Sequence, residues 1–270
     1  MSIKQDLERE KLLDDLFGDA FDDLLVDPED LHDNFLWENN TPPVSIIEFI
    51  NSDEFLGLKG RIYPYIQKAA EEIERENILE AILLLGKGSG KTTFMQIYLA
   101  YGAYFVLSLK NPQEYYGLLP GSPIAILLVS VSEKQAKEVG FAGVKAMIDR
   151  SPWFKGKFTA LSAELRFPKN LTLYCGHSGA SSWLGFNTVR AAMDETEFMT
   201  DSNNRSVARE LFRALKGSLT TRFPGKYKLL CVSSPKNEFS FLNSRFKDIK
   251  NAGTAVDLSK VGIPGGENNA

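Results

Sequence analysis

Cysteine and histidine are scarce in this sequence, which has two of each among 270 residues. Cys175 and Cys231 are too few and too far apart along the chain for a disulfide framework or a zinc site. His32 and His177 are the histidines. We therefore predict that both cysteines are reduced core residues on strands, with neither a disulfide nor a metal to bind.

Long apolar runs are also missing. No run approaches the roughly 20 residues that a membrane-spanning helix needs. The N-terminus is acidic, whereas a secretion signal is basic and then apolar. The sequence thus predicts a protein without membrane segments that stays in the cytoplasm. Its composition, 43% hydrophobic and 24% charged, is ordinary for a globular chain that holds one large α/β domain with an arm.

The net charge of −4 hides an uneven distribution of charge. Residues 1–54 carry 16 acidic and 3 basic residues, whereas residues 55–270 carry 19 acidic and 28 basic residues. A basic body fits a polyanionic partner such as nucleic acid, and a scattered, solvated surface explains the same counts equally well. The acidic overall balance is therefore no argument against DNA binding.

An apolar run at residues 82–85 leads into a glycine-rich turn and a helix-compatible segment at 94–109. This order is typical of a phosphate-binding loop, where backbone N–H groups and a helix N-terminus surround phosphate oxygens. Leu85 stands where the usual motif has its first glycine. We expect Lys91 to reach the β and γ phosphates and Thr92 to bind Mg²⁺. The predicted nucleotide-binding residues of the loop are Gly86, Lys87, Gly88, Ser89, Gly90, Lys91, Thr92 and Thr93.

A second informative stretch, residues 189–197, is mostly apolar and then reaches Asp194-Glu195, 103 residues after Lys91. An NTPase needs two carboxylates at the end of such a strand, one for Mg²⁺ and one that activates the attacking water. The dipeptide alone is common, but its position after a phosphate loop makes it informative. We therefore predict Asp194 as a metal residue and Glu195 as the catalytic base.

Two further apolar runs predict buried parallel strands, at residues 124–131 and 227–232. The first is followed by the helix start Ser132-Glu133-x-Gln135, and the second by Ser233-Ser234-Pro235. Together the runs predict an α/β P-loop NTPase of the additional-strand, catalytic-glutamate type. Its central sheet should be mostly parallel, with helices on both faces.

Composition divides the chain into three predicted parts: an acidic N-terminal arm and linker at 1–54, a P-loop ATPase domain at 55–251, and a C-terminal linker or tail at 252–270. Apolar residues within 1–25 recur at nearly helical spacing, which indicates an acidic amphipathic helix. Three roles stay open for this arm: docking on a partner or neighbouring subunit, folding onto the basic body, or fraying at the chain end.

Two other clusters have alternative interpretations. Tyr63-Pro64-Tyr65-x-Gln67 precedes the phosphate-loop strand, and either it holds an adenine, with Tyr65 and Gln67 in contact with the base, or it is a helix start with core tyrosines. Residues 203–217 predict a basic helix on which Arg205, Arg209 and Arg213 share one face.

These stretches together, over roughly residues 55–250, resemble the ATPase domain of the large terminase subunit of tailed bacteriophages. The resemblance implies an ATP-hydrolysing, Mg²⁺-dependent motor that moves double-stranded DNA into a procapsid in the host cytoplasm. Its implied partners are a portal protein, the small terminase subunit and further copies of the chain in a ring. It also implies that Lys87 senses the γ phosphate and that Ser233 and Ser234 couple hydrolysis to movement.

Relatives often carry an arginine ahead of a glycine just before the strand that ends in Asp194-Glu195. This chain has Ser182-Trp183-Leu184-Gly185 there. An arginine that acts on a neighbour's nucleotide must then come from elsewhere. The candidates are Arg190, Arg205, Arg209, Arg213 and Arg222. Acidic residues after Glu197 are scattered, so we expect no metal-dependent nuclease activity from this chain.

Two rival functions remain. One is a helicase-like translocase on single-stranded nucleic acid, which shares these motifs. The other is a nucleotide-binding assembly module that barely hydrolyses ATP, although such a module has no need for the second acid of Asp194-Glu195.

Overall fold

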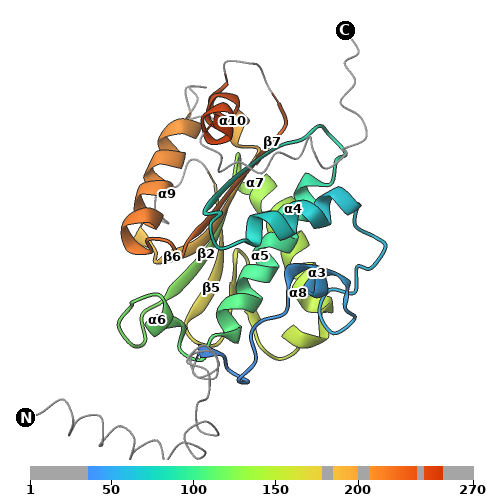
Figure 1. Ribbon diagram of the computed structural model, residues 1–270, viewed down its shortest axis with the longest axis vertical. Helices are drawn as coiled ribbons and strands as arrows, with labels where there is room; N and C mark the ends of the chain where they lie inside the picture. The colour runs from blue at the N-terminus through green and yellow to red at the C-terminus, as the bar shows by residue number, and fades with distance from the viewer. Residues whose placement is uncertain (1–35, 178–184, 200–206, 236–239, 252–270) are drawn as a thin grey trace, which may run out of the picture.

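A seven-stranded sheet, in the order β1-β7-β6-β2-β5-β4-β3, organises the part of the chain that the structure describes (Figure 1). The structure is a computed structural model, and it describes residues 36–177, 185–199, 207–235 and 240–251. β1, β7, β6, β2 and β5 pair in parallel, whereas β4 and β3 are antiparallel. The strands are β1 Glu80–Leu84, β2 Ile124–Ser130, β3 Thr159–Ala160, β4 Glu164–Arg166, β5 Leu171–His177, β6 Thr188–Asp194 and β7 Lys228–Ser233.

The strand order confirms the predicted fold class. β7 lies between β1, which leads into the phosphate loop, and β6, which ends in Asp194. Leu84 pairs with Ser233, and Val232 pairs with Asp194. The carboxyl ends of these three parallel strands therefore meet at one edge of the sheet, which is where such folds bind their ligands.

Helices cover both faces of the sheet, as predicted (Figure 1). One face carries α5 Lys91–Ser108, with α3 Ile46–Asn51, α4 Pro64–Glu74 and α8 Ala142–Arg150 packed outside it, and the other face carries α9 Ala208–Arg222 and α10 Phe241–Asn251. α5 is buried on almost all sides because it lies between the sheet and the outer helices. Short elements complete the described chain: α6 Pro112–Tyr115, α7 Glu133–Gln135, the π-helix η1 Ala136–Phe141, and the 3₁₀ turns η2 Pro152–Phe154 and η4 Thr196–Phe198.

The central strands are buried from end to end. All seven residues of β2 and all seven of β6 are buried. The β6 stretch forms a central strand although Arg190 interrupts its apolar pattern, because the carboxylate of Glu74, a partly buried residue, pairs with Arg190. The predicted basic helix at 203–217 is α9, which begins at Ala208 and continues to Arg222 within the described residues. Its apolar stripe continues beyond the predicted end, where Leu219 is fully buried.

The predicted domain boundary at residue 55 falls inside the packed body. Ile46, Phe49 and Ile50 of α3 are buried in the same core as the sheet, and the Phe49 ring stacks on Tyr104 of α5 at 5.1 Å. The predicted boundary is wrong because it was based on the charge of the segment. The acidic residues near α3 face solvent, whereas the apolar side of the helix lies in the core.

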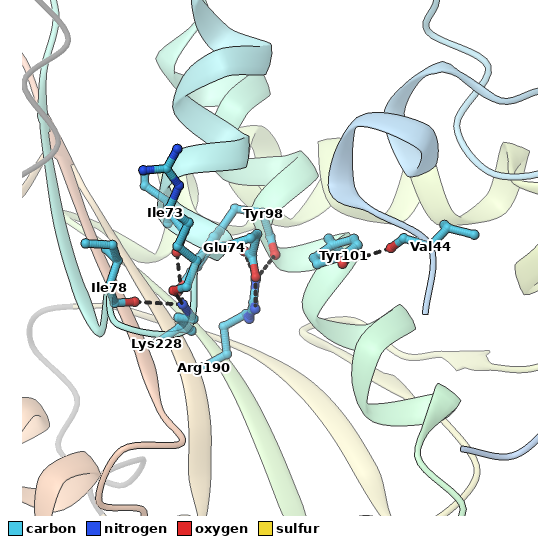
Figure 2. A network of polar contacts seen from close by, with 9 residues as sticks. Val44, Ile73, Glu74, Ile78, Tyr98, Tyr101, Arg190 and Lys228 are labelled. Atoms are coloured by element: carbon cyan, nitrogen blue, oxygen red, sulfur yellow. Dashed lines mark hydrogen bonds and ion pairs between the residues drawn. The ribbon is translucent and has the colours of Figure 1, made fainter. Parts of the chain in front are cut away.

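Two cations lie side by side at the start of β6 and β7, where Arg190 pairs with Lys228 in the ladder (Figure 2). The Lys228 ammonium donates to the carbonyls of Ile73 at 3.0 Å and Ile78 at 2.7 Å, and so closes the carboxyl end of α4. Burial lowers the pKa of Lys228 to about 8. Cys175 and Cys231 are free cysteines on β5 and β7, and Cys231 is buried, whereas Cys175 is only partly buried and so is not the core residue that we predicted. In the described part of the chain, no helix is long and apolar enough to cross a membrane.

Candidate active site

The loop between β1 and α5 has the geometry of a phosphate cradle. Gly88 and Gly90 both adopt φ of +81°, which residues with a β-carbon rarely reach. Gly90 is the N-cap of α5, so the free amides of the first helical turn face the loop. Gly86, Lys87 and Gly88 are exposed. The loop can therefore accept phosphate oxygens from solvent.

The position of Leu85 in the structure explains why this chain has no glycine there. Its side chain is 5% exposed, and its N–H donates to the carbonyl of Ser233 at 3.1 Å. The residue thus extends the β1–β7 ladder by one step and packs in the core. Backbone angles that favour glycine are found only after Leu85, at Gly88 and Gly90 of this loop.

Lys91, at the end of the loop, contacts the Asp194-Glu195 pair through Glu195. Its ammonium is 3.2 Å from Oε1 of Glu195 and 3.0 Å from the hydroxyl of Ser234. The lysine is buried, which strengthens both contacts relative to water. Lys91, Glu195 and Ser234, which were predicted separately, therefore meet here. They follow the ends of β1, β6 and β7, respectively.

Glu195 is held in an unusual backbone conformation, with φ of +49° and ψ of +42°. Such strain in a residue other than glycine costs on the order of 1 kcal/mol or more and is common at functional sites. The N–H of Ser234 donates to Oε2 of Glu195 at 3.2 Å, and the Ser233 hydroxyl donates to the same oxygen at 3.5 Å. The carboxylate is therefore fixed beside the phosphate loop.

Asp194, 2% exposed, is the buried acid of the site. Burial and the neighbouring charge of Glu195 raise the pKa of its carboxyl from 3.8 to about 6. Its Oδ1 has no hydrogen-bond partner in the described residues. A bare, buried carboxylate oxygen suits a hard cation, and Thr92 supplies a hydroxyl on the first turn of α5. These residues fit the predicted Mg²⁺ of a nucleotide.

Glu197 was given no role from the sequence, yet it is buried and connects the site to α10. Its backbone N–H donates to the hydroxyl of Ser233 at 3.2 Å. Its carboxylate accepts the N–H of Leu242 in the first turn of α10 at 2.5 Å. A carboxylate at a helix N-terminus is favourable because it offsets the helix dipole. No sequence signal could locate this contact, because it spans 45 residues.

The aromatic cluster reaches the loop through Tyr65. The Tyr65 hydroxyl donates to the carbonyl of Ser89, and Tyr63, 56% exposed, stacks on the Tyr65 ring at 5.4 Å. The Gln67 amide is engaged by the protein: it accepts from Asn51 at 3.0 Å and donates to the carbonyl of Ile62 at 3.4 Å. The structure thus brings Tyr65 to the loop, whereas Gln67 would have to exchange partners to contact a base.

Arg190 is not available as a finger arginine, which corrects that expectation (Figure 2). Its guanidinium is 6% exposed and forms a two-pronged pair with the Glu74 carboxylate at 2.6 and 2.7 Å. It also donates to the carbonyl of Tyr98 at 3.1 Å. Gly102 of α5 leaves the space, since a β-carbon there would lie 2.3 Å from Cδ of Arg190. The sequence could not reveal that partner, which lies 116 residues away.

The other predicted arginines occupy different positions. Arg222 is also excluded, because its guanidinium donates to the carbonyls of Gly185 at 3.0 Å and Phe186 at 2.6 Å, before the start of β6 and thus at the sheet edge opposite the loop. Arg209 and Arg213 are exposed on α9, and Arg209 lies nearest its N-terminus, on the loop side. Arg205 lies outside the described residues.

Comparison with known proteins places the chain among P-loop proteins. The family model described as "Uncharacterized protein MJ0330, N-terminal P-loop domain" matches residues 23–263. The uncharacterized protein MJ0330 of Methanocaldococcus jannaschii is 23% identical over 215 residues, which cover 73% of this chain and 37% of that protein.

A solved structure shares this architecture. The large terminase of bacteriophage HK97 superposes with a TM-score of 0.59 at 16% identity, covering 78% of this chain and 42% of that one. The large terminase ATPase domain of Thermus phage P74-26 gives 0.48 at 19% identity, covering 72% and 73%. The expected likeness to large terminases is confirmed at the level of the fold. The chain spans less than half the length of MJ0330 and of the HK97 protein.

Proposed function

We infer that this chain, which belongs to the family of the N-terminal P-loop domain of the uncharacterized protein MJ0330, is an ATP-hydrolysing motor like those of large terminases. The contact between Lys91 and Glu195, at 3.2 Å, carries this proposal. The cation that binds phosphate and the acid that activates water lie within one ion-pair distance. A γ phosphate on Lys91 would therefore lie within reach of a water molecule held by Glu195.

The proposed reaction begins with an exchange of partners. The phosphates of ATP occupy the loop at residues 86–90, and Lys91 leaves Glu195 for the γ phosphate. Glu195, still held by the Ser234 amide, then accepts a proton from the water that attacks the γ phosphorus in line, as the bond from that phosphorus to the bridging oxygen breaks and ADP leaves with this oxygen. A Mg²⁺ ion at Thr92 and Asp194 would supply neutralising charge at the β and γ phosphates. Lys87, which is exposed in the loop, is the residue that we propose to contact the γ phosphate.

The proposed substrate of the motor is double-stranded DNA, contacted through its phosphates. The excess of 28 basic over 19 acidic residues in residues 55–270 supports a polyanionic partner. Arg209 and Arg213, exposed near the loop side of α9, are the described candidates for a finger arginine acting on a neighbouring subunit's nucleotide. Portal and small-subunit partners, a ring assembly and a place in the host cytoplasm belong to the same proposal.

The test compares the wild type with Glu195→Gln, which keeps the size of the side chain and removes the base. We expect ATP turnover to fall roughly 10²-fold or more, while binding of a fluorescent ATP analogue stays within about 2-fold. Glu210→Gln, at an exposed acid in the first turn of α9, is the matched control and should turn over ATP like the wild type. Unchanged turnover in Glu195→Gln would refute the assignment.

The dependence of ATP turnover on added nucleic acid and on protein concentration distinguishes the motor from the two rival functions. A packaging motor should be stimulated more by linear duplex than by single-stranded DNA, and its specific activity should rise with protein concentration if neighbours complete each site. Stronger stimulation by single strands favours the helicase-like translocase. Assembly upon nucleotide binding without turnover favours the assembly module.

A further inference from the structure

The Tyr65 hydroxyl has no role in the proposed reaction so far, although it contacts the phosphate loop directly. Tyr65 lies in the first turn of α4, and its hydroxyl donates to the carbonyl of Ser89 at 2.5 Å. The Tyr63 ring stacks on the Tyr65 ring, with the two ring planes only 8° apart. The hydroxyl of Tyr65 therefore binds the loop, and one face of its ring is covered by Tyr63.

The contact fixes the direction of the peptide bond between Ser89 and Gly90. A trans peptide is planar, and its C=O and N–H groups point in opposite directions. The described residues contain no cis peptide bond. Because the Ser89 carbonyl points toward Tyr65, the Gly90 N–H points away from Tyr65. This N–H donates to no other residue in the described part of the chain.

The Gly90 N–H belongs to a set of backbone amides that suits an anion. Gly88 and Gly90 have positive φ, whereas Ser89 between them does not. Such alternation turns successive N–H groups toward one side and forms an anion-binding concavity. Gly90 is also the N-cap of α5, whose first amides have no partner within the helix. The amide that Tyr65 orients thus lies between the loop and the helix N-terminus, where phosphate oxygens bind.

Contacts at both ends of α4 keep the Tyr65 hydroxyl in place. At the loop end, a β-carbon on Gly90 would lie 3.6 Å from Cδ2 of Tyr63 and 3.7 Å from Cγ1 of Ile66, so the first turn of α4 packs against the loop. At the other end, the Glu74 carboxylate pairs with Arg190 of β6 at 2.6 and 2.7 Å (Figure 2). The helix therefore holds the loop in a fixed relation to the sheet.

We propose that Tyr65 is a positioning residue for the phosphate loop: its hydroxyl holds the Ser89 carbonyl so that the Gly90 N–H faces the phosphates of the nucleotide. This role differs from contact with the base, which the sequence suggested for Tyr65. Without the hydroxyl, the peptide can turn, and ordering it on binding lowers the affinity for phosphate. The inference rests on the proposed function, because it assumes that the loop binds a nucleotide's phosphates.

The test compares two probes in the full chain with Mg²⁺, by isothermal titration calorimetry. One probe is ADP, and the other is pyrophosphate, which carries phosphates without a base. Tyr65→Phe removes the hydroxyl and keeps the ring. Tyr101→Phe is the matched control, because the Tyr101 hydroxyl also donates to a backbone carbonyl, that of Val44 at 3.0 Å, away from the loop (Figure 2).

We expect Tyr65→Phe to weaken the binding of ADP and of pyrophosphate by the same factor, about 5-fold or more, which is the usual net contribution of one hydrogen bond. Tyr101→Phe should bind both probes like the wild type. A loss for ADP alone would indicate contact with the base and overturn the inference, as would unchanged affinities or an equal loss in Tyr101→Phe. A wild type that binds neither probe would overturn the proposed function as well.

A spectroscopic measurement separates positioning from a general loss of stability. In protein labelled with ¹⁵N-glycine and carbonyl-¹³C-serine, the Gly90 amide is recognised by its coupling to the Ser89 carbonyl. Saturating pyrophosphate should move the Gly90 amide proton downfield in the wild type and less far in Tyr65→Phe, because the amide no longer faces the phosphate in a fixed direction. Shifts of equal size in the two proteins would contradict the proposed role of Tyr65.

Discussion

Replacing Asp194 by asparagine should stabilise the nucleotide-free protein. Asp194 is 2% exposed, lies next to the charge of Glu195 and has an oxygen without a hydrogen-bond partner among the residues that the structure describes. The folded protein thus keeps a poorly solvated carboxylate in place, and asparagine removes its charge while keeping its shape. Selection for stability alone would not keep this aspartate, because its buried charge is destabilising. The cost is expected if the site holds a cation.

The magnitude follows from the pKa of Asp194, which is raised from 3.8 to about 6. A difference of about 2 in pKa between folded and unfolded states corresponds to about 3 kcal/mol of destabilisation at neutral pH. The asparagine NH₂ group must find its own partner, which costs about 1 kcal/mol. We therefore expect a gain of about 2 kcal/mol in the free energy of unfolding, or roughly 4–8 °C in Tm for a domain of this size.

The dependence on pH gives a second, independent sign. Because the folded pKa is the higher one, the folded state binds the proton more tightly, and the penalty is full above about pH 6 and vanishes below about pH 4. The stability difference between Asp194→Asn and the wild type should therefore shrink as the pH falls from 7 to 4.5.

Urea denaturation in EDTA measures both effects, with Asp149→Asn as a control at a surface acid paired with Lys145 that should change stability by less than about 1 kcal/mol. Added Mg²⁺ and ADP should stabilise the wild type more than Asp194→Asn. A variant that is less stable than the wild type in EDTA at pH 7, or a difference that grows on acidification, would refute the reasoning.

Three other substitutions test the packing that supports the site. Arg190→Met should lower the free energy of unfolding by about 3–5 kcal/mol in urea, because it leaves the Glu74 carboxylate, whose side chain is only 12% exposed, without its partner, and a second change, Glu74→Met, should recover part of the loss; full stability in the single variant would contradict this. Glu197→Ala should cost about 1–3 kcal/mol and speed amide hydrogen exchange at the start of α10, whereas unchanged exchange there would disprove the anchoring contact. Gly102→Ala should lower Tm by crowding Arg190, whereas Gly217→Ala on α9, where a β-carbon meets no described atom within 4 Å, should raise it slightly; the same sign for both would show that space is not the cause.

Local sequence patterns located most of the secondary structure and the main chemical groups. The glycine loop, its lysine and the Asp194-Glu195 pair could be recognised because each depends on neighbouring residues and on the end of a strand. The domain boundary at residue 55 failed because the charge of a segment does not reveal its buried side: Phe49 of α3 lies in the core. The exact span of α9 failed for a related reason, since its buried stripe continues beyond the arginines that marked it.

The roles of single polar residues were predictable only where a local sequence motif marked the residue. Ser233 and Ser234 were expected near the site, and the structure places both on Glu195. Arg190 looked equally suited to catalysis, yet Glu74 binds it 116 residues away. Glu197 drew no prediction, because nothing near it in the sequence marks its contact with α10.

By itself, the sequence determined the class of fold and the chemistry of its central loop, because alternating turns and apolar runs fix strands and helices locally, and a glycine loop before a lysine has few other uses. Only the tertiary structure decided that β7 stands between β1 and β6, that Lys91 reaches Glu195, and that Arg190 is a buried structural cation. These outcomes depend on which strands become neighbours. Pairing between distant segments is set by the packing of the whole core, to which every apolar residue contributes and which no short stretch encodes.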